Sequence, residues 1–241
     1  MGAAGDAGYT KLSSLHERYT MITANFIHRT FRIKCGDSIG TGFTIDVNGK
    51  QYLVTARHVV EGISSSTPLE VFGNNSWVVV DAALVAHGDG DIDVSVIAPK
   101  EVMSPPNLPV VPSSGGLAYG QDVYFLGYPF GVLSKVIFAG EGHPLPLVKK
   151  ALFSAFAGAV YLLDGHNNPG FSGGPVIFGP SGVTPQNIAA IVSGYRFHPE
   201  AIHLGDAETD LTYRYNTGIM ITYKIEIALA MIQANPIGAP V

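Results

Sequence analysis

Short segments rich in hydrophobic and β-branched residues recur along the chain and are separated by Gly, Pro, Asn and Asp. Many short segments bounded by turn-forming residues are typical of a β-barrel or β-sandwich, and they argue against alternating strands and helices. Between two of them, Val47-Asn48-Gly49-Lys50 predicts a tight hairpin, because Asn-Gly accepts the positive φ angles of a type I′ turn. The predicted strands are residues 31–34, 42–46, 51–55, 77–85, 94–97, 123–126, 175–178, 188–193 and 218–222.

One helix and one long connection complete the pattern. Residues 225–233 contain good helix formers and are followed by Asn235-Pro236, which ends a helix. Residues 99–116 contain five prolines and the tetrapeptide SSGG, so we interpret them as the connection between two halves, each a small β-barrel. The predicted fold class is all-β, with an N-terminal extension over residues 1–30, a first barrel over 31–112, and a second barrel with a short C-terminal helix over 113–241.

The composition is that of a compact chain with a large core. Hydrophobic residues make up 46% of the 241 residues and charged residues 14%, against a usual charged share of about 25%. The net charge of −5 and the absence of a basic run argue against nucleic-acid binding. No apolar segment approaches the ~20 residues that span a bilayer, so no membrane association is expected.

The location of the protein is predicted from its first residues and its cysteine content. Residues 1–9 lack the basic and apolar regions of a signal peptide, which favours a cytoplasmic location. Cys35 is the only cysteine, so no internal disulfide can form, and we interpret it as a small buried hydrophobic residue. A chain without disulfides suits a reducing compartment, although an exported bacterial protein or a viral origin stays open.

One serine lies between glycines in residues 169–175, PGFSGGP in one-letter code. Glycines allow a tight backbone that directs two N–H groups at one point, and in an acyl-transfer enzyme these are the N–H groups of Gly170 and Ser172, which stabilise an oxyanion. A serine hydroxyl becomes a good nucleophile when an imidazole removes its proton and a carboxylate orients that imidazole. Without such partners, the segment is a glycine-rich turn with an exposed serine.

The candidate imidazole is His58, in the segment TARHV at residues 55–59. It follows a predicted apolar strand, and the small Ala56 lets the backbone pass close to a carboxylate that orients the ring. Seven other histidines are present, and a histidine near a strand end can also be a core residue. Arg57 is unusual beside such a histidine and is expected to face solvent.

The candidate acid is one of three aspartates in a single loop, Asp89, Asp91 and Asp93. We prefer Asp93 because it stands at the start of a predicted strand, and a strand edge positions a buried carboxylate better than a loop tip does. Asp91 stays open as the alternative. The spacing also matches a calcium loop, but Val94 occupies the position of the required Gly and Lys100 that of the required Glu, so no metal site is predicted.

At these residues the chain resembles the trypsin-like serine peptidases, whose catalytic residues follow the same order of His, then Asp, then Ser. Within that family it is similar to the disulfide-free, HtrA-like bacterial branch. The resemblance covers residues 31–235 or so and is specific in four further segments. These are GTGFTI at 40–45, GQDVYFLGYPFG at 120–131, IVSGY at 191–195, and residues 217–234.

The resemblance implies a chymotrypsin-type fold of two six-stranded β-barrels and a serine endopeptidase that hydrolyses peptide bonds through an acyl-enzyme. It assigns His58 as general base and then acid, Asp93 as the acid that orients it, and Ser172 as the nucleophile. The implied partner is a protein or peptide substrate, with no cofactor and no metal. The residues implied to bind the substrate and line its specificity pocket are Ser193, Gly194, Tyr195 and Gly218.

Some features depart from the family. The Ile/Val-x-Gly-Gly amino terminus of activated members is absent, and Phe171 stands where many members have an Asp that receives this terminus, so activation by propeptide cleavage is not expected. No PDZ-like domain is expected after residue 235. No acid matches the Asp of the trypsin pocket, although Asp164 lies nearby in sequence, and we expect a preference for apolar or small side chains. If Tyr195 fills the pocket, only small ones fit.

Two other hypotheses explain the same residues. The glycines and serine of residues 170–174 match the G-x-S-x-G nucleophile elbow of α/β-hydrolases, whose histidine would then be His198 or His203. That elbow must open a helix, whereas residues 176–178 predict a strand. The second hypothesis is a protease-like fold used as a binding or scaffold module, with little activity or with activity switched by a partner.

Overall fold

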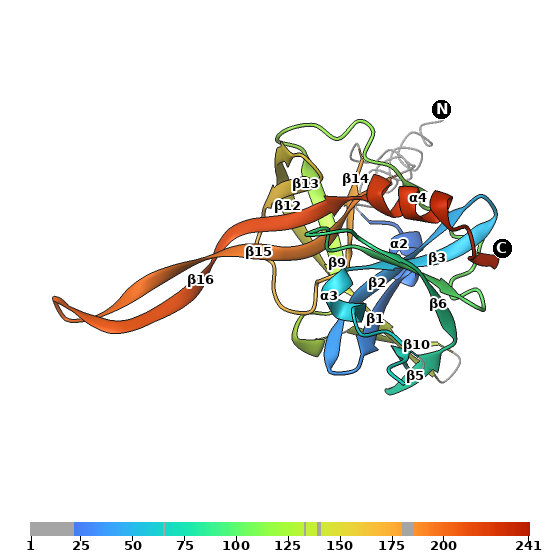
Figure 1. Ribbon diagram of the computed structural model, residues 1–241, viewed down its shortest axis with the longest axis horizontal. Coiled ribbons are helices and arrows are strands. Elements are labelled where there is room, and N and C mark those ends of the chain that lie inside the picture. Colours follow the sequence, from blue (N-terminus) through green and yellow to red (C-terminus); the bar gives the residue numbers. More distant parts are fainter. Residues whose placement is uncertain (1–21, 65, 133, 139–140, 180–185) are drawn as a thin grey trace, which may run out of the picture.

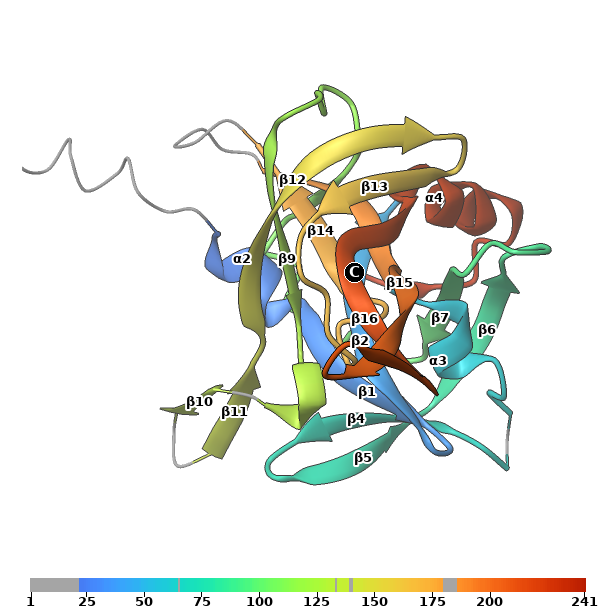
Figure 2. The ribbon, with the colours of Figure 1, turned by 90° about the vertical axis from the view of Figure 1, so that its left-hand side faces the viewer.

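The computed structural model describes residues 22–64, 66–132, 134–138, 141–179 and 186–241. These residues form two large curled sheets of mostly antiparallel strands, a small two-stranded sheet, a long protruding hairpin and short helices (Figure 1). Figure 2 looks along the hairpin onto the two sheets. Within the described residues, no helix is both long enough and apolar enough to cross a bilayer.

The first sheet is curled because its two edge strands follow each other in the chain. The strand order is β5-β4-β1-β2-β3-β7-β6, and only Asp81 separates β5 from β6. Residues 77–85, predicted as one strand, therefore form two. Lys100 stabilises the break, because its backbone N–H donates to the Asp81 carbonyl and its ammonium donates to the Asp81 carboxylate. Counted as one bent strand, β5 and β6 give the six predicted strands. The strands are β1 (Thr30–Cys35), β2 (Ser38–Val47), β3 (Lys50–Thr55), β4 (Leu69–Gly73), β5 (Ser76–Val80), β6 (Ala82–His87) and β7 (Ser95–Pro99).

The second sheet closes on itself as a six-stranded barrel. Its pairing runs β14-β9-β12-β13-β16-β15, and β15 pairs with β14 again to close the ring. The fold class expected from the sequence is confirmed. The strands are β9 (Asp122–Gly127), β12 (Leu147–Ala157), β13 (Val160–Asp164), β14 (Pro175–Phe178), β15 (Asn187–Leu204) and β16 (Ala207–Lys224).

The domain division at residue 112 stays a prediction, and two short strands lie near or across it. Strand β8 (Val111–Pro112) pairs with β15 of the second sheet. Strand β17 (Ala239–Pro240) returns to the first sheet and pairs with β3. The first and the last strand of the described residues, β1 and β17, therefore both belong to the first sheet.

Both barrels contribute to one hydrophobic core. Phe43 and Val54 of the first sheet and Ile177 and Ile191 of the second belong to the same buried cluster. The helix predicted near the C-terminus is present as α4 (Ile225–Ala234) and is packed on this core. Its buried face consists of Ile225, Ala228 and Ile232. The two halves are thus held together by apolar contacts, as a chain with a single buried cysteine requires.

Part of the predicted N-terminal extension belongs to the body of the protein. Residues 1–21 of the extension lie outside the described residues. Helix α2 (Ala24–His28) follows, and Thr30 already begins β1. Arg29 is buried, pairs with Asp46 at 2.5 Å, and donates from Nε to the carbonyl of Leu108. This arginine ties the start of the described chain to the connection between the barrels.

Strands β15 and β16 continue far beyond their barrel as a two-stranded arm, residues 196–217, which projects from the body in Figure 1. The sequence predicted strands only over 188–193 and 218–222. Proline at position 199 argues against a central strand, and in the described residues this part of β15 pairs with β16 alone. Smaller elements are α3 (Arg57–Val60), η1 (Pro129–Gly131), β10 (Ser134–Phe138) and β11 (Glu141–Leu145).

Candidate active site

His58 and Asp93 are joined by two hydrogen bonds. His58 is the second residue of the one-turn helix α3, which follows β3, and Asp93 lies just before β7. The backbone N–H of His58 donates to Asp93 Oδ1 at 2.8 Å, and its ring Nδ1 lies 2.7 Å from Oδ2. Two contacts to one carboxylate fix both the helical turn and the plane of the ring, and they leave Nε2 available for other chemistry.

The Asp93 carboxylate accepts a third hydrogen bond, 2.6 Å long, from Ser193 Oγ in β15. Burial raises the pKa of Asp93, but the hydrogen bonds from the His58 ring, Ser193 and the His58 amide outweigh it and hold this pKa below its usual range. Asp93 is thus a carboxylate near neutral pH. Of the three acids in its loop, it is the one that contacts His58.

Arg57 differs from its expected solvent-facing position. Its guanidinium is half-buried and donates to the carbonyl oxygens of Gly88 and Gly90, at 2.9 and 3.2 Å, and to Glu61. These carbonyls belong to the loop that carries Asp93. A planar guanidinium with several donors can brace such a loop, which explains why an arginine stands beside the candidate histidine.

Ser172 lies in the turn between β13 and β14, next to the other candidates. Its Oγ donates to the carbonyl oxygen of Ser193 at 3.0 Å, and not to the ring of His58. Ser193 therefore contacts Asp93 through its hydroxyl and Ser172 through its carbonyl. The structure brings His58, Asp93, Ser193 and Ser172 into one hydrogen-bonded chain that crosses from the first barrel to the second.

Two glycines around Ser172 are required by the backbone. Gly170 has φ +105°, and a Cβ there would lie 2.5 Å from the carbonyl oxygen of Tyr128. Gly173 has φ +85°, and a Cβ there would lie 2.0 Å from the carbonyl oxygen of Thr41. Larger residues would have to move neighbouring backbone, so this turn accepts only glycine at both positions.

Strand β2 of the first barrel holds this turn. The backbone N–H of Thr41 donates to the carbonyl of Ser172 at 2.8 Å, and its hydroxyl donates to the carbonyl of Gly170 at 2.7 Å. Thr41 lies in the GTGFTI segment noted in the sequence, but the sequence did not indicate its contact with the serine turn. The carbonyl of Pro169 accepts the Phe130 N–H at 2.9 Å.

The carbonyl oxygens of Pro169, Gly170 and Ser172 accept the hydrogen bonds described above, whereas two N–H groups of the turn remain available. In the part of the chain that the structure describes, the N–H groups of Gly170 and Ser172 have no hydrogen-bond partner. The Phe171 N–H, between them in sequence, donates to the carbonyl of Asn168 at 3.2 Å. Unpaired backbone donors beside a candidate nucleophile can stabilise an oxyanion.

The side chain of Phe171 anchors the turn in the core of the second barrel. Its side chain is fully buried in the core of the second barrel and meets Phe125 edge-on, with the ring centroids 4.8 Å apart. Gly127 leaves space for this ring, since a Cβ there would lie 2.6 Å from Phe171 Cδ1. The residue before the candidate serine is thus held by its aromatic ring in an apolar core.

Of the residues expected to bind substrate, Ser193 contacts Ser172 through its carbonyl oxygen. Among the described strands, Gly194 and Tyr195 of β15 pair with β16 on one side only, because the pairing of β15 with β14 ends at Ile191. Gly218 has φ +78°, and its carbonyl accepts the N–H of Gly165 at 2.8 Å. The segment that precedes the serine turn is thus attached to β16 at Gly218.

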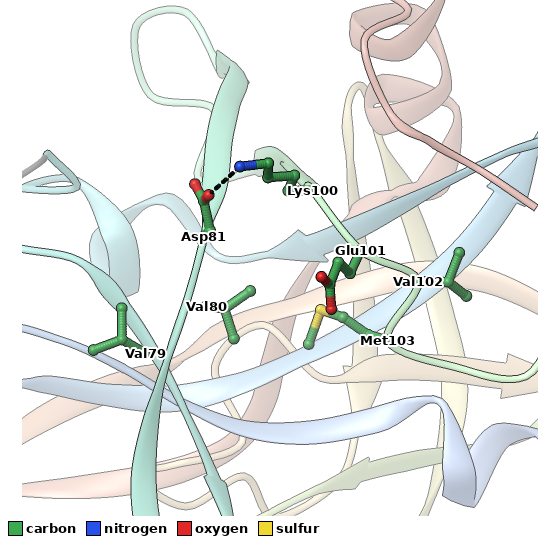
Figure 3. Close-up of a pocket in the computed structure, with 7 residues that line it drawn as sticks. All are labelled: Val79, Val80, Asp81, Lys100, Glu101, Val102 and Met103. Carbon is green, nitrogen blue, oxygen red and sulfur yellow. Dashed lines mark hydrogen bonds and ion pairs between the residues drawn. The ribbon is translucent and has the colours of Figure 1, made fainter.

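Two surface pockets differ in whether candidate site residues line them. An open pocket adjoins His58 and is lined by Arg57, His58, Glu61 and residues 90–93. The pocket in Figure 3 is formed by residues 79–81 and 100–103 around the Asp81–Lys100 ion pair, and no candidate site residue lines it. No group of three His, Cys, Asp or Glu residues that could hold a metal ion is present within the described residues.

Comparison with known proteins identifies the family. A family model described as a trypsin-like peptidase domain matches residues 40–182, more than half of the chain. The chain belongs to the trypsin-like peptidase family. It is a trypsin-like serine endopeptidase, as the resemblance implied. The α/β-hydrolase hypothesis is wrong, because the serine turn leads into strand β14 and not into a helix.

Several solved structures share the fold at low sequence identity. The Rv3671c protease of M. tuberculosis H37Rv, in an inactive form, is 21% identical with a TM-score of 0.54, over 88% of this chain and 91% of that one. The HtrA-type protease AlgW, solved with a tripeptide, is 20% identical with a TM-score of 0.55, over 88% and 61%. The serine endoprotease from Yersinia pestis is 18% identical with a TM-score of 0.56, over 88% and 64%.

This trypsin-like peptidase spans less than two thirds of the AlgW and Yersinia chains. At these identities the likeness shows a common fold and carries no residue roles. No curated protein matches the sequence.

Proposed function

We propose that this peptidase cleaves polypeptides through an acyl-enzyme in which Ser172 is the nucleophile, His58 the general base and then acid, and Asp93 the carboxylate that orients the ring. The observation that carries the proposal is the two-point contact of His58 with Asp93, continued through Ser193 to Ser172. Side chains from both barrels meet there, and each has the chemistry that its role requires.

The reaction begins with a change of hydrogen bond. Ser172 Oγ releases the carbonyl of Ser193 and turns its O–H toward His58 Nε2, which accepts the proton as Oγ attacks the carbonyl carbon of the substrate. Asp93 stabilises the imidazolium that forms and keeps the proton on Nδ1. The imidazolium then protonates the leaving amine as the C–N bond breaks, and water hydrolyses the acyl-enzyme by the same steps.

The N–H groups of Gly170 and Ser172 stabilise the oxyanion of the tetrahedral intermediate. Two observations support this role. Neither N–H group has another partner within the described residues, and the shape of the turn depends on its glycines. Losing one such donor costs about 3 kcal/mol of activation free energy.

The substrate lies along β15 beside Ser193, Gly194 and Tyr195, with Gly218 opposite. The open edge of β15 beyond Ile191 supports this, because an extended peptide can add to an unpaired strand. The partner is accordingly a protein or peptide in extended form. The tripeptide in the AlgW structure is consistent with such a site in a protein of this fold.

A second candidate function is a protease-fold binding module whose cleavage is switched on by a partner. The observation that favours it is the hydrogen bond of Ser172 to Ser193, which turns the hydroxyl away from His58. This module would react with active-site probes slowly until the partner binds.

A fluorophosphonate probe followed by peptide mapping tests the proposal. We expect a single adduct on Ser172, lost in Ser172→Ala and in His58→Ala. His198→Ala, in the arm, is the matched control and should label as the parent does. An adduct on another serine, or full labelling of His58→Ala, would refute the assignment. Slow adduct formation without hydrolysis of a peptide library would favour the switched module.

A further inference from the structure

Strand β12 carries a lysine on the face that points into the second barrel. Ala151 and Phe153 are buried on this face, Leu147 and Lys149 are half-buried, and the intervening residues of the strand are exposed. Lys150, the next residue, lies on the outer face and pairs with Asp122 at 2.7 Å. A charged residue in an inward position is costly to bury and needs partners that compensate.

The partners of Lys149 belong to the segment that leads to Ser172. Its ammonium donates to the carbonyl oxygen of His166 and to Asn168 Oδ1, the latter at 3.1 Å. It also lies 5.8 Å from the ring centroid of Phe171 and 5.9 Å from that of Phe125. Both oxygen partners are uncharged, and burial lowers the pKa of Lys149. Three of the four groups lie between residues 166 and 171.

These contacts fix the turn whose shape decides where the Gly170 N–H points. The carbonyl of Asn168 accepts the Phe171 N–H, so residues 168–171 form one turn with Gly170 inside it. Lys149 holds this turn at the Asn168 side chain and at the Phe171 ring. Thr41 holds it at the Gly170 carbonyl from the first barrel. The turn is thus fixed on two sides without any carboxylate of its own.

We propose that Lys149 is a positioning residue that keeps residues 168–171 in the conformation in which the Gly170 and Ser172 N–H groups are both available to the oxyanion. The proposal rests on the function proposed above. It explains how the turn is restrained with Phe171 at the position before the serine, since the half-buried Lys149 and an apolar anchor together hold it.

The test compares Lys149→Met with Lys149→Arg and with Lys150→Met. Methionine fills similar space but cannot donate, so we expect kcat on a peptide substrate to fall by about 10- to 100-fold, less than for outright loss of an oxyanion donor. A peptide boronate, which mimics the tetrahedral intermediate, should weaken by about the same factor, whereas KM should change by less than about threefold. Lys149→Arg should recover most of kcat, and Lys150→Met should match the parent.

Hydrogen exchange of peptides that cover residues 166–172 gives a readout that does not depend on turnover. Lys149→Met should exchange faster there, and Lys150→Met should not. Unchanged exchange overturns the positioning role even if the enzyme proves inactive. Faster exchange with unchanged kcat and boronate affinity also overturns it, as does an arginine variant as impaired as methionine. Failure of the proposed function itself is seen separately, as absent Ser172 labelling in the parent protein.

Discussion

Replacing Asp93 by Asn tests how the hydrogen bonds around His58 determine which ring nitrogen carries the proton. The Asp93 carboxylate accepts three: Oδ1 from the His58 backbone, and Oδ2 from the His58 ring and from Ser193 Oγ. Asparagine has one oxygen and one NH₂ group to meet the same three groups. It can therefore be placed in two orientations, and they have different consequences.

In the first orientation the asparagine oxygen faces the ring and Ser193, and its NH₂ group opposes the His58 N–H. An unsatisfied donor there costs about 1–3 kcal/mol. In the second, the oxygen accepts the His58 N–H and the NH₂ group donates to ring Nδ1, which moves the ring proton to Nε2. The second NH₂ hydrogen can donate to Ser193 Oγ, which then accepts instead of donating, so no two donors oppose each other. However, Nε2 can no longer accept the proton of Ser172. The second orientation is therefore preferred.

The expected activity loss has two parts. Reaching the productive orientation costs about 1–3 kcal/mol, and the imidazolium loses a charged hydrogen-bond partner worth about 1.5–3 kcal/mol. Together these lower kcat by about 10²- to 10⁴-fold, at 1.36 kcal/mol for each factor of ten. Because the second orientation leaves only the half-buried Ser193 O–H without its former acceptor, the free energy of unfolding at neutral pH should fall by only about 1–2 kcal/mol.

The assays are kcat on a peptide substrate near neutral pH and urea unfolding followed by fluorescence. Asp91→Asn is the matched control, because Asp93 is the acid that contacts His58, and its kcat should stay close to that of the parent. Asp93→Asn with kcat within about tenfold of the parent would refute the tautomer argument. So would an equal loss in Asp91→Asn.

The same carboxylate predicts how stability depends on pH. Since the pKa of Asp93 is lower in the folded protein than in the unfolded chain, its contribution is present above the unfolded value near 4 and is lost as pH falls through the folded value. The parent should thus lose stability below about pH 4 more steeply than Asp93→Asn. If the urea midpoints of the two proteins fell in parallel as the pH was lowered to about 2.5, the lowered pKa of Asp93 would be contradicted.

Two further predictions concern the serine turn and the arm. Phe171→Ala removes a fully buried ring that contacts Phe125, so the free energy of unfolding should fall by about 3–5 kcal/mol in urea unfolding, with a drop in kcat for the protein that remains folded. A loss below about 1 kcal/mol would show that Phe171 is not the anchor of the turn. Replacing residues 198–215 by Asn-Gly closes the hairpin at the Phe197–Asn216 pair, and Tm should change by less than about 3 °C because the removed residues pair only with each other in the described chain. A large fall in Tm in calorimetry would mean that the arm stabilises the body.

The fold was largely predictable because its signals are local. The segment of β14 has the predicted bounds, and the hairpin at Asn48-Gly49 has both residues at positive φ, as its sequence requires. The arm was missed for a physical reason. Strand signals describe local propensity, and residues such as Pro199 and Glu200 carry little of it. Their pairing depends on register continued from the barrel, which no local pattern encodes.

The candidate site was predictable only in part. The segments around His58 and Ser172 are recognisable from sequence because glycines and small residues are needed there. The hydrogen bond of Ser193 to Asp93 joins residues 100 positions apart, and that of Thr41 to Gly170 joins residues 129 positions apart. Such contacts follow from the way the barrels pack and leave no trace in a local pattern. The expectation that Arg57 faces solvent failed for the same reason, since its acceptors are backbone carbonyls.

Neither barrel contains a complete site, and the contacts between the barrels are reciprocal. Ser193 of the second barrel donates to Asp93 of the first, and Thr41 of the first donates to Gly170 of the second. A relative shift of the barrels by about 1 Å stretches both hydrogen bonds beyond useful length, because such bonds weaken steeply past their normal range. The shared apolar core that spans both sheets opposes this shift. In a chain that cannot form an internal disulfide, packing of that core therefore controls the geometry of the candidate site, and mutations within it should lower activity before they unfold the protein.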